Sequence, residues 1–284
     1  MDHVPVSFIE DLLKDLTILN DATEYTRLPK NYGKCAKQVK EKGHYKTLVI
    51  QNGNFDSFYY TNDEHNEIDT KTRTLTPKFR VHKYVEFIDD DEEPLPKSDN
   101  LTNILDEFLK EPGMLGLHVD GNSFNSKWAK ICSAWESLRQ VSISSDFTDS
   151  VWQLLHNLLK QEQLICLGLS EDYDGSEEVA FLGAFLQQKQ FRNLRLSAWN
   201  EEVMNQLMLL TYRNKEKNLG KTITWYCKAT LHDDSFECKE RIGEGCISYR
   251  NGVVIANYYN DVATLETSVE KFMEDVDQCE IVFV

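Results

Sequence analysis

Three cysteines and a histidine in the last third of the chain could form a metal site. Cys227, Cys238 and Cys246 lie near His232, and thiolate and imidazole groups are ligands that zinc prefers in proteins. The cysteines are separated by 11 and 8 residues, which matches no common zinc-binding spacing. We therefore expect no metal and no cofactor, and we interpret these cysteines as ordinary thiols in strands and loops.

Five consecutive acidic residues, Asp89 to Glu93, could bind calcium through their carboxylates. The run lacks the alternating ligand spacing and the central glycine of an EF-hand, and Pro94 and Pro96 follow it. We therefore interpret this segment as an exposed loop.

The sequence contains no recognisable catalytic motif. Its 13 glycines form neither GxxxxGK nor GxGxxG, and neither CxxC nor HExxH occurs. We therefore predict that the protein is not an enzyme. An active site assembled from distant residues is the alternative that the sequence leaves open.

The composition indicates a globular protein with an acidic surface. Apolar residues make up 41% of the 284 residues, which is enough to form a core. The formal net charge of −16 disfavours nucleic acids and anionic membranes as partners, because both are bound through basic patches. A basic protein partner is favoured instead. The alternative is that the acidity serves only solubility.

The chain also carries signs of an intracellular location. No apolar run approaches the roughly 20 residues that a membrane span requires, and the first residues lack the basic start and apolar stretch of a signal peptide. The seven cysteines are odd in number and scattered, and some, such as Cys166, lie in apolar stretches. We therefore expect reduced cysteines and a cytoplasmic or nuclear protein.

A pattern of apolar residues recurs in the second half of the chain. One apolar residue is followed by a second three positions later and by a third two positions after that. The four copies are Met114, Leu117 and Val119; Leu138, Val141 and Ile143; Leu164, Leu167 and Leu169; and Phe191, Leu194 and Leu196. The copies start 24 to 27 residues apart, within the period of leucine-rich-repeat-like solenoids. The alternation of the last two positions predicts a strand.

Amphipathic segments lie between these predicted strands. Positions 147–160 have apolar residues at helical spacing, with Asp149 or Ser150 as candidate N-caps, and Ser176 and Asn200 are candidate N-caps of two further helices. A single strand–helix unit cannot bury its own apolar face, which favours stacking. The predicted fold class is α/β, a leucine-rich-repeat-like solenoid of strand–helix units. An ordinary α/β domain with a parallel sheet is the alternative.

The two ends of the chain differ from this repeat. At the C-terminus the sequence predicts a β-hairpin and helix cap: a strand over 222–227, a hairpin over 246–259 with its turn at Asn251 and Gly252, a helix over 264–276, and a strand over 279–284 that closes the stack. Before the repeat it predicts a helix over 4–16, strands near 47–50, 58–60 and 79–87, and a helix that Asn100 caps.

The first 45 residues open with a proline-containing dipeptide and an amphipathic helix, followed by a short acidic turn and a second helix. The residues of interest are Val4, Pro5, Phe8, Ile9, Leu12, Leu13 and, in the second helix, Tyr32. This arrangement resembles an F-box. Together with the strand–helix units, the chain resembles the nematode F-box proteins with an F-box-associated homology region.

The resemblance implies the substrate-recognition subunit of a cullin-type ubiquitin ligase. Segment 1–45 would dock those seven residues onto a Skp-type adaptor protein, with an amphipathic helix in a groove. Segment 46–284 would hold a protein target. A free-standing acidic interaction or inhibitor protein, without ligase association, is the alternative function, and an enzyme is the third.

Overall fold

A computed structural model describes residues 5, 6, 9, 13, 25–62, 66–71, 74–89, 100–170, 176–197, 201–226, 236 and 238–284. The chain divides into two compact units, Met1–Arg139 and Gln140–Val284, and each is described by itself. Strands and helices occur in both, so the predicted mixed α/β class is confirmed. Residue 45, where the sequence predicts a boundary, lies inside the first unit and just within its first strand.

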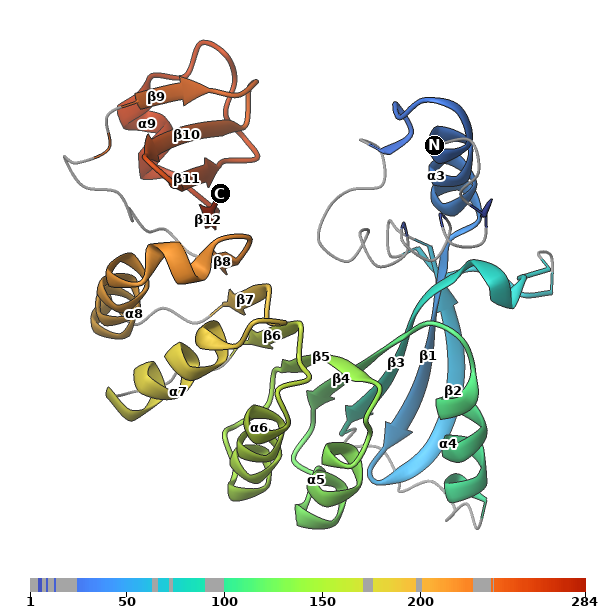
Figure 1. Ribbon diagram of the computed structural model, residues 1–284. Coiled ribbons are helices and arrows are strands. Elements are labelled where there is room, and N and C mark those ends of the chain that lie inside the picture. Colours follow the sequence, from blue (N-terminus) through green and yellow to red (C-terminus); the bar gives the residue numbers. More distant parts are fainter. Residues whose placement is uncertain are drawn as a thin grey trace. The chain divides into compact units, whose positions relative to one another are not determined.

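Among the described residues, the first unit has four strands, three α-helices with defined bounds and one short 3₁₀ helix (Figure 1). In chain order they are α3 (Lys30–Lys42), β1 (His44–Gln51), β2 (Asn54–Thr61), the short 3₁₀ helix η1 (Pro77–Phe79), β3 (Arg80–Ile88), α4 (Leu101–Lys110), β4 (Met114–Asp120) and α5 (Ser126–Ser133). The strand order is β2-β1-β3-β4. β1 and β2 form an antiparallel hairpin, whereas β1 with β3 and β3 with β4 run parallel.

Alternation of apolar residues explains how this sheet acquires a buried face. Leu48, Val85 and Leu117 are at most 1% exposed and lie on the side that α4 and α5 cover. On that side Phe87 makes an edge-to-face contact with Trp128 of α5, at 5.0 Å between ring centroids. Successive side chains of a strand point to opposite faces, so the residues between these project from the other face.

The N-terminal segment packs onto α3. Ile9 and Leu13, spaced one helical turn apart, are 1% and 2% exposed and form a cluster with Cys35, Ala36 and Val39 of α3 and with Val81. Pro29 is the N-cap of α3, a place where its missing N–H costs nothing. The apolar stripe that the sequence shows therefore forms a small core of its own.

The second unit continues the alternation of strands and helices (Figure 1). Its elements are β5 (Leu138–Ile143), which lies in this unit from Gln140 on, α6 (Asp149–Gln161), β6 (Cys166–Leu169), α7 (Ser176–Gln187), β7 (Asn193–Leu196), α8 (Glu201–Arg213), η2 (Lys215–Asn218), β8 (Thr222–Trp225), β9 (Cys238–Arg241), β10 (Cys246–Asn251), β11 (Val254–Tyr259), α9 (Val269–Glu274) and β12 (Gln278–Phe283). The strand order is β5-β6-β7-β8-β12-β11-β10-β9.

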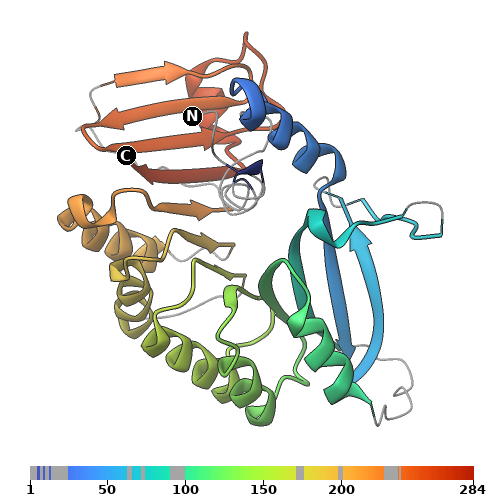
Figure 2. The ribbon, with the colours of Figure 1, turned by 45° about the vertical axis from the view of Figure 1, so that its right-hand side comes forward.

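The repeated sequence pattern corresponds to real strands. All four predicted strands are present, and β5, β6 and β7 lie side by side and parallel, as predicted. Val141, Leu167 and Leu194 align in this register and are fully buried. Helices α6, α7 and α8 lie together on one side of β5 to β8 (Figures 1 and 2). β4, the first strand of the pattern, belongs to the first unit and pairs with β3.

The local signals for the ends of helices were partly wrong. Thr148, rather than Asp149 or Ser150, is the N-cap of α6, because its extended backbone lets the hydroxyl accept the Val151 N–H at 3.4 Å. α7 begins at Ser176 itself, and Asn200 lies outside the described residues. The predicted helix over 264–276 is only Val269–Glu274, because Ser268 caps it.

The C-terminal strand is not the terminal cap that the sequence suggested. β12 lies between β8 and β11 and is antiparallel to both. The predicted β10–β11 hairpin forms, and β9 pairs beyond it with β10. The apolar character of β12 therefore reflects an interior position, because its Cys279, Ile281 and Phe283 are fully buried.

Two expectations concern the chain as a whole. Five of the cysteines, Cys35, Cys132, Cys166, Cys246 and Cys279, are free thiols; Cys227 lies outside the described residues. Within the described ranges, no helix combines the length and the apolar character needed to cross a bilayer.

Candidate functional site

Polar side chains gather on the sheet face of the first unit opposite α4 and α5. We call this the polar face and define it by Thr47, Tyr59, Tyr84, Glu86 and His118. These residues come from all four strands and alternate with buried ones such as Leu48, Val85 and Leu117. Because one helix layer covers the apolar face, the polar face is the side on which a partner could contact the sheet.

A hydrogen-bonded network crosses this face. The Tyr59 hydroxyl donates to Glu86 Oε2 at 2.8 Å, and His118 Nδ1 lies 3.0 Å from Glu86 Oε1. The hydrogen bond from His118 holds the pKa of the Glu86 carboxyl below its usual value, against the opposing effect of burial. Burial raises the pKa of Tyr59. Both oxygens of Glu86 are thus engaged, so the network fixes three side chains in place before any partner arrives.

An aromatic platform lies beside the network. Tyr84 stacks on His82 with an interplanar angle of 7° and a centroid distance of 5.8 Å. Its ring also lies over β4 at Gly116, where a Cβ atom would come within 2.4 Å of two ring carbons. Glycine is therefore required at position 116 for the ring to lie flat on the sheet. Flat, immobilised aromatic rings are common anchors in protein recognition.

The helix-covered side of the first unit contains a cation cluster. Lys46 Nζ lies 2.7 Å from Glu111 Oε1 and 4.3 Å from the centroid of the Phe58 ring, and Arg80 also pairs with Glu111. These contacts attach the end of α4 to the sheet. We assign this cluster a structural role.

Buried lysines cap two helices in the same way. Lys83 Nζ donates to the carbonyls of Phe108, Leu109 and Glu111 at 3.1, 2.7 and 2.5 Å, at the C-terminal end of α4. Burial lowers the pKa of Lys83 to about 8. In the second unit Lys221 donates to carbonyls at the end of α7, and burial lowers its pKa too. Each ammonium satisfies carbonyls that a helix end leaves unpaired.

The second unit has a polar row of its own. Ser142, Gly168, Arg195 and Thr224 align across β5 to β8, opposite the helices. Farther along the sheet, Glu280 Oε2 accepts hydrogen bonds from Asn257 at 3.1 Å and from Tyr259 at 3.2 Å. Burial raises the pKa of the nearby Cys246 thiol, so this cysteine is not an activated nucleophile.

The residues that the F-box resemblance singles out divide into three groups. Pro5 is exposed. Ile9 and Leu13 are buried, and Tyr32 packs against their cluster. The remaining three, Val4, Phe8 and Leu12, lie outside the described residues. The structure thus brings Ile9, Leu13 and Tyr32 together, and their role in adaptor binding stays a prediction.

The metal sites that the sequence suggested gain no support. Among the described residues, no group of three His, Cys, Asp or Glu side chains is placed to hold a metal ion. Cys227, His232 and positions 90–93 of the acidic run lie outside them. Asp89, the first residue of that run, accepts the Ser123 N–H at 2.8 Å.

Sequence reasoning missed the polar face. Glu86 and His118 are 32 residues apart and meet only because β3 and β4 pair in a register that places them side by side. The pattern in the sequence that indicates this face is a polar residue at every second position of 82–86. The residues that alternate with them are buried in the structure. Comparison of this chain with protein-family models, curated proteins and solved structures finds no match.

Proposed function

We propose that the protein is a recognition subunit that holds a protein target on the polar face of the first unit. The observation that carries this proposal is the one-sided placement of α4 and α5, which leaves Tyr59, Glu86 and His118 fixed by mutual hydrogen bonds on the other side. Such prearranged polar and aromatic side chains suit binding, because little conformational entropy is lost on contact.

We further propose that the strand–helix units form a leucine-rich-repeat-like stack. The in-register parallel pairing of β5 to β8 supports this, as does the position of α6 to α8 on one side of these strands (Figure 2). In a stack of this kind each unit buries the apolar face of its neighbour and the opposite strand face stays available to partners.

The N-terminal segment is proposed to dock the protein onto a Skp-type adaptor of a cullin-type ubiquitin ligase. Supporting this role, Pro5 is exposed and Val6 is 46% exposed, although Ile9 and Leu13 beside them are buried. The segment therefore separates an inner surface, which packs on α3, from an outer one that a partner can reach. The target-holding region would then be delivered to the ligase through this outer surface.

The adaptor proposal predicts that Val6→Asp weakens binding to a purified Skp-type adaptor at least about tenfold, because a charge would be buried in an apolar contact. Titration calorimetry of the full chain with the adaptor measures this. Val262→Asp in the second unit, where Val262 is 79% exposed, is the matched control and should bind as the wild type does. Unchanged binding by Val6→Asp would contradict the proposed docking surface.

A second candidate is a free-standing interaction or inhibitor protein. The burial of Ile9 and Leu13 in the cluster with α3 favours it, since these side chains are then unavailable for an adaptor. It predicts that wild-type protein shows no heat of binding with the adaptor in the same calorimetric experiment, while it still captures a protein target.

A further inference from the structure

The outer edge of β2 is exposed to pairing with another strand. β2 stands at the end of the strand order, and among the named strands of the described residues it pairs with β1. At its C-terminal end, the Ile68 N–H donates to the Tyr60 carbonyl at 2.7 Å, and Thr61 bridges to Glu67. The Tyr60 carbonyl therefore points away from β1, and the short segment 66–68 covers only this end of the edge.

Strand geometry extends this observation to Phe58. Residues two apart in a strand point their backbone groups in the same direction, and Phe58 and Tyr60 pair regularly with Leu48 and Lys46. Within the part of the chain that the structure describes, no backbone group bonds to Phe58 on the outer side or to the Tyr60 N–H. Outward N–H and C=O groups of this kind form a template for an added strand.

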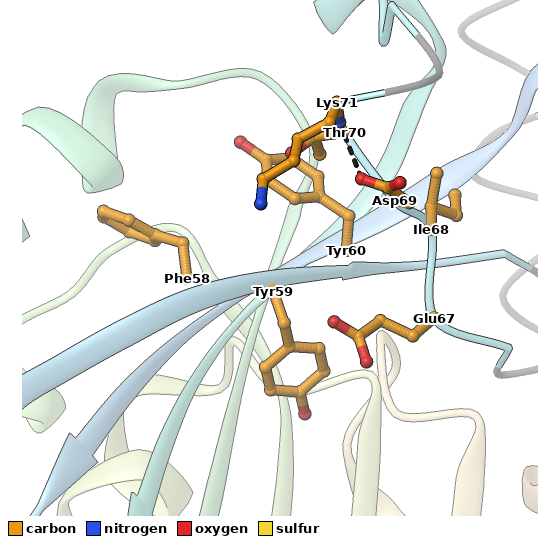
Figure 3. Close-up of a pocket in the computed structure, with 8 residues that line it drawn as sticks. All are labelled: Phe58, Tyr59, Tyr60, Glu67, Ile68, Asp69, Thr70 and Lys71. Carbon is orange, nitrogen blue, oxygen red and sulfur yellow. Dashed lines mark hydrogen bonds between the residues drawn. The ribbon is translucent and has the colours of Figure 1, made fainter.

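A hollow of about 440 Å³ lies beside this edge and is lined by Phe58, Tyr60, Ile68 and the polar residues around them. Figure 3 shows Phe58 and Tyr60 on one side of β2, and Tyr59 and Glu67 on the other. An added strand would therefore place its alternate side chains in two different environments. The side of Phe58 and Tyr60 also holds Asp69 and Lys71, which carry opposite charges, whereas the side of Tyr59 holds the carboxylate of Glu67 (Figure 3).

The exposed ring of Phe58 is held in position. It is 39% exposed, stacks on Phe108 at a centroid distance of 6.0 Å, and carries Lys46 Nζ at 4.3 Å from its centroid. A ring fixed from behind offers an apolar contact to a partner without an ordering cost. This contact lies next to the unpaired backbone groups of the same residue.

The charge around the edge selects the partner. Among the described residues of 54–71, Asp56, Glu67 and Asp69 are exposed carboxylates and Lys71 is the one lysine or arginine; the whole chain has a net charge of −16. A second copy of the chain would bring the same carboxylates against these, and like charges in opposed strands repel. A basic segment of a different protein is favoured.

We propose that the outer edge of β2 binds an extended segment of another protein in which apolar and basic residues alternate. The segment pairs with the backbone N–H and C=O of Phe58 and with the N–H of Tyr60, whose C=O already accepts the Ile68 N–H. Its apolar side chains lie against the Phe58 and Tyr60 rings and its basic side chains face Glu67 and Tyr59. This site is an edge of the sheet that adjoins the polar face at Tyr59, and it does not rest on the proposed function because it requires no target on that face.

The test uses the full chain and a fluorescently labelled synthetic peptide that alternates valine and lysine. Fluorescence anisotropy should show saturable binding. A peptide of the same composition with all valines before all lysines should bind at least about tenfold more weakly, because only the alternating order places both side-chain types correctly. Equal binding of the two peptides would overturn the proposal.

Reversing the charge at the proposed site tests whether peptide binding depends on the charge at that site. The double variant Glu67→Lys and Asp69→Lys should lose the valine–lysine peptide and gain binding of a valine–glutamate peptide. The control, Asp261→Lys with Glu266→Lys, changes the net charge equally at exposed positions of the second unit and should keep the original preference. A reversal that appears in both variants would show an effect of net charge only and would refute the site.

Hydrogen exchange gives the direct view of strand pairing. The amides of Phe58 and Tyr60 should exchange quickly in the free chain and slow on addition of the valine–lysine peptide. Unchanged exchange at saturating peptide would contradict strand addition. Slow exchange without peptide that depends on protein concentration would instead identify a second copy of the chain as the occupant and overturn the proposal.

Discussion

Replacing Leu13 with alanine is expected to lower the free energy of unfolding by about 2–5 kcal/mol, the usual cost of removing a buried leucine side chain. Leu13 is 2% exposed and packs with Ile9 against Cys35, Ala36 and Val39 of α3. The truncation leaves a cavity between Leu13 and α3, because the surrounding side chains cannot close it without losing other contacts. Urea denaturation of both proteins measures the difference.

The matched control for Leu13→Ala is Val6→Ala, which truncates the exposed residue of the same segment and should leave the free energy of unfolding nearly unchanged. The two variants also distinguish a core role of Leu13 from a role in adaptor docking. If Leu13→Ala unfolds at the same urea concentration as the wild type but no longer binds the Skp-type adaptor, Leu13 is a docking residue and the packing described for it is wrong.

Replacing Lys83 with methionine is expected to cost about 1–3 kcal/mol at pH 7, because buried carbonyls lose their donor. Methionine matches the length of the lysine stem but cannot donate to the carbonyls of Phe108, Leu109 and Glu111. Lys110→Met is the control, since Lys110 belongs to α4 and pairs with the exposed Glu107 at the surface. It should change stability little.

The Lys83 side chain also predicts a pH dependence with a definite sign. Its pKa is lowered to about 8 in the folded chain, mainly by burial, against about 10.4 in the unfolded chain. Between these values the unfolded state holds more protons, so the stability of the wild type rises with pH relative to Lys83→Met. Urea midpoints of both proteins across this window measure the effect. A difference that stays constant or shrinks with pH would contradict the lowered pKa.

The elements that the sequence predicts well are those whose signal is local. The three-and-two spacing of apolar residues predicts β5, β6 and β7 correctly, because the side chains that these strands point into the core, such as Val141 and Leu194, are fully buried. The hairpin was predicted correctly but its turn lies one residue later than predicted: Asn251 ends β10 and pairs with Val254, so the turn residues are Gly252 and Val253. Gly252 adopts a φ of 58°, which glycine tolerates. Periodicity and turn chemistry act within a few residues, so a single sequence contains them.

The elements that were missed depend on distant partners. β9 contains Lys239 and Glu240 and has no apolar alternation, and it exists only because it pairs with β10. Lys83 lies on the same face of β3 as apolar residues, so the sequence does not indicate its role. That role depends on the end of α4, whose carbonyls accept hydrogen bonds from Lys83. The place of β12 between β8 and β11 is likewise a matter of topology, which local patterns do not specify.

The same distinction applies to the candidate site. The sequence predicts the N-terminal residues as a binding site because their helical spacing is a local pattern, and the structure places Ile9 and Leu13 in a core. The sequence does not predict the polar face, because Tyr59, Glu86 and His118 come from three strands whose order and register were unknown. Recognition surfaces on sheets are built from neighbours in space, so a pattern along the chain does not reveal them.

Quantitative affinity purification with mass spectrometry is the measurement that shows whether the polar face holds a protein target. Three forms of the full chain are compared: wild type, Tyr84→Ala with His118→Ala, and Leu209→Ala on the exposed side of α8, where Leu209 is 58% exposed. We expect the wild type and Leu209→Ala to capture target proteins and the double variant to lose them, while equal urea midpoints show that all three are folded. Capture of the same proteins in equal amounts by the double variant would contradict the proposed role of the polar face.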